Sequence, residues 1–445
     1  MELLKRLFKD STTRNKLLLV IMILFITFIG YRIPIPGIDT NYLRLMFADS
    51  PLASGFLNIL TGNSLSSMSI FALSISPYIS ASIVLQLMGA FIPAIERIQK
   101  DGAVGRQKME RLTFVVSALI AIVESLFMAI GLGQKGLFFE YTWYMVVITT
   151  VIWTVGACLL TWIGQLITNK LIGNGISMIL LFNILSSMPD SLATTFTTLS
   201  NGKETWVSIL IAVAMVVVGL LMIAYVVVMD EGEKRIHLSN SNQSSGITGA
   251  NDNIMPLRVN MGGVMPIIFS SAIMSVPTMI AHLFDIDSES IGGIIIGCFN
   301  QVNWFRFEQP IYSIGILIFI PLTYVFSYFY SEMSFNTHDI AENLKKSGGI
   351  INGIRPGEPT AEYLHKQVRR ILLIGTTMLV VIALIPTLIS GIFGLTSLSF
   401  GGTTIIIIVG VLLELRNTIS AQTSSVAYKS LLKKSSRKRL GGRGR

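Results

Sequence analysis

Apolar runs separated by short charged segments repeat along the whole chain. A helix needs about 20 apolar residues to cross the hydrocarbon core of a bilayer. Reading the gaps between charged residues predicts ten membrane spans. They cover residues 17–36, 72–95, 112–132, 145–169, 171–189, 206–229, 261–284, 310–331, 371–390 and 401–415.

Two boundaries between neighbouring predicted spans are marked only weakly in the sequence. The uncharged window 371–413 is too long for one helix, and we divide it at the Ser-, Gly- and Phe-rich stretch 390–402. The fourth and fifth spans are separated only around Asn169 and Lys170. An even number of spans puts both termini on the same side of the membrane.

The second span differs from an ordinary membrane helix. It lies in a charge-free window, 50–95, whose first part is rich in Ser and Gly, and Pro77 stands in its middle. Proline removes a backbone donor and clashes with the preceding turn, so a helix here must kink or break. Broken backbone at membrane depth is tolerated where it is buried in protein or lines a wet cavity. The stretch 70–87 therefore indicates the pathway of a membrane conduit.

Composition supports a multi-span membrane protein. Of 445 residues, 51% are hydrophobic and 13% are charged, whereas a soluble domain carries about 25% charged residues. The two cysteines, Cys158 and Cys298, are far apart and predict free thiols rather than a disulfide. The apolar run near the N-terminus lacks a small-residue cleavage site and predicts a retained span.

The positive charges predict the orientation. With a cytoplasmic N-terminus, 28 of the 34 Lys and Arg residues lie on inward segments and 5 on outward ones, as the positive-inside rule requires. The net charge of +9 is therefore explained mostly by membrane topology and does not by itself indicate a nucleic-acid-binding surface. The inward loops 230–260 and 332–370 are too long for connectors and suggest docking of a soluble partner. The basic tail, 428–445, is either a solvated segment on anionic lipid or a specific site.

The two groups of five spans have a common pattern. The second span of each group carries a proline after small or polar residues, at Ser76-Pro77 and at Gly262-Gly263 with Pro266. Interrupted segments at corresponding places in two inverted halves indicate a pathway between the halves. A secondary transporter would share this pattern, but transporters place ionisable residues at the midplane.

The sequence contains no recognisable catalytic or metal-binding motif. It contains no phosphate-loop motif and no His-Glu-x-x-His or Cys/His cluster, and its four histidines are scattered. We therefore expect no catalytic residue, no metal and no cofactor.

Several collinear motifs resemble the SecY family, whose members form the central channel of the bacterial protein translocase. They are PYISASIVLQL (77–87), GNGIS (173–177), PLRVNMGGVMPIIF (256–269), AENLKKSGG (341–349), GIRPGEPT (353–360) and FGGTT (400–404). The resemblance runs from about residue 16 to residue 427 in the correct order. The AENLKK and GIRPG forms look bacterial or plastid.

The resemblance implies an all-α integral membrane protein, with ten transmembrane helices in two pseudo-symmetric five-helix halves that form a clamshell with a short plug helix. The N-terminal half would be 1–190, the C-terminal half 191–427 and the cytoplasmic tail 428–445. The plug would be 55–69, which includes Gly55, Gly62, Ser64 and Ser69. The membrane would be the bacterial cytoplasmic membrane.

The resemblance also implies a pore ring and a lateral gate. The ring would consist of Ile75, Ile79, Ile176, Ile268 and Ile408. A ring of branched apolar side chains dewets and blocks ions without binding them. The gate, between the second and seventh spans, would include Pro77, Ser80, Gln86 and Pro266. Ser80 and Gln86 could instead make only local hydrogen bonds. Glu124 has either a structural partner or a place near the end of its span.

Loop 332–370 would carry the docking site. In the family, the arginine of GIRPG contacts the motor ATPase SecA and the ribosome, and here it is Arg355. The turn around it, made by Gly353, Pro356 and Gly357, would present one cation at a loop tip. Lys345 and Lys346 would add to it, or they merely set topology.

Further partners follow from the same resemblance: the small subunits SecE and SecG, signal sequences and secretory polypeptides, and SecDF and YidC. Loop 237–254 departs from the family, because its tip is Ser-, Asn- and Gly-rich with one acid, Asp252, instead of basic. This departure leaves open an accessory Sec channel for specific surface glycoproteins.

Overall fold

The computed structural model describes most of the chain, and the chain divides into two compact units. Unit 1 comprises Met1–Pro189 and Val411–Arg445, and unit 2 comprises Asp190–Gly410. The described residues are 11–38, 68–134, 136, 138–200, 205–240, 253–283, 290–305, 310–393 and 403–420.

Unit 1 is built of helices. They are α2 (Ser11–Tyr31), α5 (Ser76–Phe91), α6 (Pro93–Lys100), α7 (Gly102–Gln134), α8 (Trp143–Lys170) and α9 (Gly175–Ser200), whose last part belongs to unit 2. A further helix, Thr403–Ser420, begins in unit 2 and ends in unit 1. The most extensive packing between helices of unit 1 joins α7 to α8 and α5 to α7.

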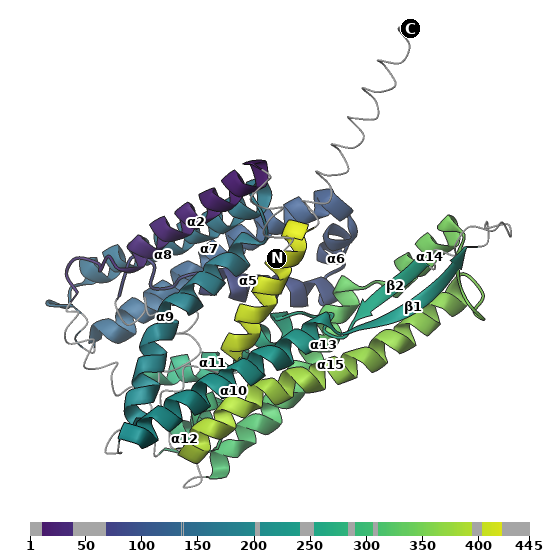
Figure 1. Cartoon of the computed structure of the whole chain (residues 1–445). Coiled ribbons are helices and arrows are strands. Elements are labelled where there is room, and N and C mark those ends of the chain that lie inside the picture. Colours follow the sequence, from purple (N-terminus) through teal and green to yellow (C-terminus); the bar gives the residue numbers. More distant parts are fainter. Residues whose placement is uncertain are drawn as a thin grey trace, which may run out of the picture. The chain divides into compact units, whose positions relative to one another are not determined.

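Unit 2 combines membrane helices with a small sheet (Figure 1). Its helices are α10 (Thr205–Glu231), α11 (Met265–Leu283), α12 (Ile291–Phe299), α13 (Ile314–Ser334), α14 (Thr337–Ser347) and α15 (Glu358–Phe393). Two 3-10 turns, η1 (Gln301–Asn303) and η2 (Pro310–Ser313), precede α13. Its strands are β1 (Glu233–Asn240), β2 (Asn253–Arg258) and β3 (Gly349–Ile351).

The predicted all-α membrane fold is confirmed, and each of the ten predicted spans coincides with a helix. Within the described ranges, eight helices are long and apolar enough to cross a membrane, and the bent pair α5–α6 makes a ninth. The apolar core of α11, Met265–Thr278, is shorter. The span window of α10 is only 6% buried inside the protein, as expected of a helix that faces lipid or a partner.

Several helices extend beyond the apolar runs that predicted them. Helix α7 begins at Gly102 rather than at 112, and α15 begins at Glu358 rather than at 371. In the first turns of α15, Leu364 and Val368 are buried although their neighbours are polar. A helix continues into water when one face still packs, so a hydropathy reading underestimates its length.

The second predicted span, 72–95, is shorter and bent. Helix α5 begins at Ser76, and Pro77 lies in its first turn, where a proline costs no hydrogen bond. The predicted interruption is therefore a helix start rather than a kink within a helix. After Ile92 the chain turns by 108° into the amphipathic helix α6.

The two long inward loops meet in one sheet, which the all-α expectation did not include. The strand order is β2-β1-β3, with Ile236 opposite Met255 and Leu238 opposite Ile351. Figure 1 shows this hairpin beside α14 and the first part of α15. Side chains of the sheet and of α15 form one apolar core: Ile236, Leu257, Ile351, Leu364, Val368 and Ile371.

Candidate functional site

The segment Met68–Ile75, which leads into α5, is a series of turns held from several sides. Its backbone pairs with the segment after α2, because Ile35 N–H donates to Met68 O at 3.2 Å and Ile70 N–H donates to Ile33 O at 3.1 Å. Met68 and Ser74 have positive φ angles of 44° and 51°. Non-glycine residues rarely adopt such angles, and they persist where the surroundings fix them.

Helix α8 holds the same segment from another side. The indole Nε1 of Trp153 donates to Ser69 O at 3.1 Å, and the Trp153 side chain is fully buried. One turn further, Gly156 lies so close to Ile70 O that any Cβ on residue 156 would overlap that oxygen. A glycine is required for this approach.

A triangle of hydrogen bonds fixes the end of the segment. The amide Nδ2 of Asn183 in α9 donates to the Tyr31 hydroxyl and to Ser74 Oγ, both at 2.9 Å. The two hydroxyls lie 3.0 Å apart and share a third bond. All three residues are at most 4% exposed. The sequence analysis did not predict this cluster. Tyr31 lies 43 residues before Ser74, and Ser74 lies 109 residues before Asn183, so no local pattern connects them.

Four of the five predicted ring residues lie at or near helix starts, and Ile408 lies further along its helix. Ile75 precedes α5 as its N-cap, and Ile79 follows one turn later, with exposures of 0% and 7%. Ile176 is in the first turn of α9, and its side chain lies against Gly164 of α8. In unit 2, Ile268 is buried and Ile408 is half-buried.

The GNG sequence at 173–175 forms a capped turn at the start of α9. Gly173 has a φ of +81°, and the Asn174 side chain accepts hydrogen bonds from the Ile176 and Ser177 N–H groups at 3.2 and 3.4 Å. Helix α8 ends at Lys170 and α9 begins at Gly175. A cap of this type sets the first residue of a helix, which places Ile176 on α9.

The predicted gate residues on α5 make contacts within unit 1. Ser80 hydrogen-bonds to the carboxylate of Glu124 on α7, so Glu124 has the structural partner that was one of its two expected readings. Gln86 Nε2 donates to Ser82 Oγ at 3.1 Å, a local bond, while Gln86 Oε1 is buried and has no hydrogen-bond partner in the described part of the chain. In unit 2, Pro266 is buried near the start of α11, and its carbonyl accepts from Ser270 Oγ at 2.8 Å.

Most of the predicted plug lies outside the described residues. This applies to Gly55, Gly62 and Ser64. Ser69, the last residue of the predicted plug, is described, and it forms an isolated β-bridge with Pro34. Ser69 is fully buried, and its hydroxyl has no hydrogen-bond partner among the described residues.

The predicted turn around Arg355 is present. Gly353 and Gly357 have φ angles of +82° and +106°, which only glycine adopts without strain. The Thr360 hydroxyl donates to Arg355 O at 2.8 Å, and Thr360 N–H donates to Gly357 O, so the turn is tied to the start of α15. The Arg355 side chain is exposed between the two glycines.

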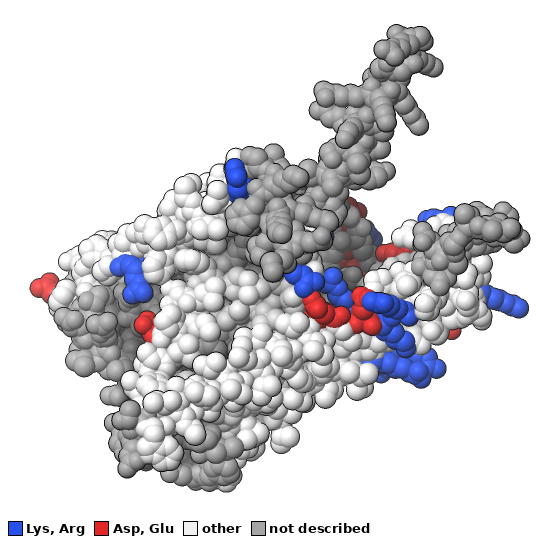
Figure 2. Space-filling view, viewed as in Figure 1, with Lys and Arg blue, Asp and Glu red and all other residues white. Residues whose placement is uncertain are grey.

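Helix α14 presents further cations beside this turn. Its N-terminus is capped by the Asn336 side chain, and its C-cap is Gly348 with a φ of +72°. Lys345 and Lys346 stand in its last turn, where cations favour the helix dipole. Lys346 Nζ lies 2.8 Å from Glu342 Oε1, and this bond lowers the pKa of the exposed Glu342. In Figure 2 the charged side chains of unit 2 gather around the hairpin, α14 and the start of α15.

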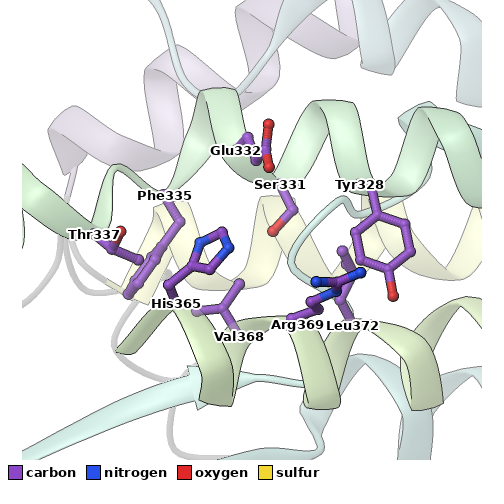
Figure 3. Close-up of a pocket in the computed structure, with 9 residues that line it drawn as sticks. All are labelled: Tyr328, Ser331, Glu332, Phe335, Thr337, His365, Val368, Arg369 and Leu372. Carbon is purple, nitrogen blue, oxygen red and sulfur yellow. The ribbon is translucent and has the colours of Figure 1, made fainter. Parts of the chain in front are cut away.

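A pocket of about 290 Å³ lies at the base of the same loop, between the end of α13 and the start of α15. Figure 3 shows His365 and Arg369 extending from α15 toward Ser331 and Tyr328 on α13. Its lining combines Tyr328, Ser331, Glu332, Phe335, Thr337, His365, Val368, Arg369 and Leu372. The pocket therefore gathers basic, acidic and hydroxyl groups at the base of this loop.

The comparison with protein families decides the relationship. The family model described as SecY matches residues 69–416, which is most of the chain. The chain belongs to the SecY family. The resemblance inferred from the sequence motifs is thereby confirmed, and the match begins at Ser69 and ends at Arg416 in the last helix.

Two curated SecY proteins are similar to this chain at the same level of sequence identity. The chain is 34% identical over 418 residues to the protein translocase subunit SecY of Pseudomonas aeruginosa, covering 93% of this chain and 91% of that protein. It is 34% identical over 424 residues to the protein translocase subunit SecY of Synechocystis, covering 94% of each.

Solved structures share the SecY fold at low sequence identity. A structure described as a protein-conducting channel matches with a TM-score of 0.63 and 16% identity, covering 94% of each chain. Sec61 in a canine ribosome-channel complex from the endoplasmic reticulum matches with a TM-score of 0.62 and 16% identity, again covering 94% of each chain. These likenesses show that the chain has the fold of these channels. The family match, the curated relatives and the apolar helices together show a multi-pass membrane protein.

Proposed function

We propose that this protein is the channel-forming subunit of a protein translocase in a bacterial cytoplasmic membrane. It moves secretory polypeptides across the membrane and releases membrane-protein segments sideways into the lipid. The observation that carries the proposal is the SecY family match from 69 to 416, joined to relatives that are themselves translocase subunits. The protein acts as a passive conduit and carries out no enzymatic step.

Ion sealing falls to the five isoleucines Ile75, Ile79, Ile176, Ile268 and Ile408, with segment 55–69 as a plug. Branched apolar side chains exclude water, and they part around a passing chain without hydrogen bonds that depend on its sequence. Support comes from the burial of Ile75, Ile79 and Ile268 and from the N-cap position of Ile75. The lateral gate uses α5, with Pro77, Ser80 and Gln86, and α11, with Pro266.

Docking falls to the turn that presents Arg355, with Lys345 and Lys346 beside it. A guanidinium has a fork of donors that suits carboxylates, backbone carbonyls and phosphates alike. It therefore fits both the motor ATPase SecA and the ribosome, and the canine Sec61 relative was solved in a ribosome-channel complex.

The remaining partners are the small subunits SecE and SecG, signal sequences, SecDF and YidC. Both termini are cytoplasmic, because this orientation puts 28 of 34 Lys and Arg residues inside. The tail 428–445 lies against anionic lipid. Residues 1–190 and 191–427 form the two halves of the clamshell.

Crosslinking of a stalled secretory precursor tests the proposal. Cys158→Ala and Cys298→Ala first remove both native thiols, and single cysteines then replace Ile79 or Ile268. The precursor should crosslink to both positions and not to Leu221→Cys, since Leu221 is 65% exposed on α10. Absence of labelling at both positions, with transport of a small solute instead, would refute the proposal.

A further inference from the structure

The hydrogen-bond triangle of Tyr31, Ser74 and Asn183 connects three separate parts of unit 1. Tyr31 ends α2, Ser74 lies in the turn before α5, and Asn183 lies within α9. Asn183 Nδ2 donates to both hydroxyls at 2.9 Å, and the hydroxyls bond each other at 3.0 Å. Ser74 and Asn183 are each 1% exposed, so neither can exchange these partners for bulk water.

The triangle holds a backbone conformation that the local sequence disfavours. Ser74 has a φ of +51°, a region that glycine enters freely and serine rarely. Its hydroxyl is the side-chain group that anchors it there, because it bonds both Tyr31 and Asn183. A glycine at residue 74 would keep the backbone angle and lose both anchors.

The start of α5 depends on this anchor. Ile75 is the N-cap of α5, and no side chain caps the helix there. Serine, threonine, aspartate or asparagine usually fixes the first residue of a helix, and an isoleucine cannot. Ser74 directly precedes Ile75, and Ile79 N–H donates to Ile75 O at 3.1 Å. Residue 74 therefore sets the position of Ile75 and the rotational phase of Ile79.

We propose that Tyr31, Ser74 and Asn183 are positioning residues that replace the missing helix cap and hold Ile75 and Ile79 in the ion seal. This inference rests on the proposed function, because it assigns the seal to those isoleucines. The three polar residues touch no passing substrate in this scheme. They act through the place where α5 begins.

The test measures resting ion conductance of the translocase, purified with its partner subunits and inserted into planar bilayers. The variants are Tyr31→Phe, Ser74→Gly and Asn183→Leu, each of which removes polar atoms at nearly constant size or backbone angle. Each should raise the resting conductance several-fold. Combining Tyr31→Phe with Asn183→Leu should add little to the larger single effect, because both changes break the same cluster.

Ser125→Ala is the matched control. Ser125 Oγ and Thr154 Oγ1 lie 3.0 Å apart and join α7 to α8 in the same unit, and neither residue belongs to the hydrogen-bond triangle. Its loss should leave the conductance unchanged, although it also removes a buried interhelical bond. Equal leaks from Ser125→Ala and the cluster variants would mean general loosening and would overturn the inference. Tyr31→Phe alone decides the matter if Asn183→Leu fails to assemble.

The variant Ile79→Gly distinguishes an error in the isoleucine seal from an error in the positioning role of the triangle. If Ile79→Gly leaks while all cluster variants stay tight, the positioning role is wrong and the isoleucine seal stands. If Ile79→Gly and the cluster variants all stay tight, the seal assignment and the positioning role are both wrong. Leakage from Ile79→Gly and the cluster variants, with a tight Ser125→Ala, supports both.

Discussion

Asn260 Nδ2 donates a 2.6 Å hydrogen bond to Asp230 Oδ1, and this bond closes the base of the β1–β2 hairpin. Asp230 lies at the end of α10, and Asn260 follows β2. Beside it, Val259 N–H donates to Gly232 O at 2.8 Å. The two ends of loop 230–260 are thus joined before the chain enters α11.

Asn260→Ala should destabilise unit 2. Removing a hydrogen-bond partner of a carboxylate costs about 1.5–3 kcal/mol, and Asn260 is only 7% exposed. Unfolding in mixed detergent micelles, followed by tryptophan fluorescence, measures the loss. Asn352→Ala is the control, because Asn352 is exposed and bonds Ser239 Oγ at the surface. An equal loss in both variants would contradict the importance of the hairpin base.

Gly156→Ala should disturb the turn before α5. A methyl group at residue 156 would overlap the carbonyl oxygen of Ile70, so α8 and the turn must separate. Overpacking of this kind costs about 1–3 kcal/mol. Thermal unfolding of the detergent-solubilised protein should show the loss. On α10, a Cβ at Gly219 meets no atom of the described residues within 4 Å, so Gly219→Ala should cause no such loss. A comparable loss in Gly219→Ala would contradict the steric explanation for Gly156→Ala.

Gly357→Ala should loosen the loop that presents Arg355. Its φ of +106° is strained for alanine, at a cost of about 1–3 kcal/mol. Thermolysin, which cleaves before large apolar residues, should then cut the Gly353–Ile354 bond faster than in the native protein, and amide hydrogen exchange near Thr360 should accelerate. Glu362→Ala, an exposed change within α15, is the control and should leave both rates unchanged. Unaltered cleavage of Gly357→Ala would show that the turn tolerates a side chain.

Arg355→Glu tests docking separately from folding. Reversing the charge of one exposed side chain should lower SecA-driven export into vesicles strongly and leave thermal unfolding unchanged, because the Arg355 side chain is exposed and its carbonyl holds the turn. Lys366→Glu, another exposed cation in the same loop, is the matched control. Normal export by Arg355→Glu would remove this residue from the docking site.

Much of the membrane architecture could be predicted from the amino-acid sequence. Long uncharged runs can satisfy their backbone groups in lipid only as helices, so charges alone located every span to within a few turns. The Gly353 and Gly357 positions predicted a turn for a related reason, since glycine tolerates backbone angles that other residues avoid. The motif match identified the SecY family directly.

Helix ends beyond the membrane were harder to predict. The first turns of α15 read as polar loop, yet Leu364 and Val368 pack into a core shared with Ile236 and Ile351. Those partners come from two loops far apart in sequence. Whether a mixed segment becomes helix, strand or loop depends on such partners, and local propensity does not supply them.

Only the tertiary structure brought Tyr31, Ser74 and Asn183 together. In the sequence, each of the three resembles any other polar residue near or within a membrane segment. A hydrogen bond between residues far apart in sequence produces no periodic pattern that could reveal it. The sequence determined which segments enter the membrane, since that depends on the hydropathy of each segment by itself. The tertiary structure decided where α5 begins, because that depends on contacts from α2, α8 and α9 at one serine-containing turn.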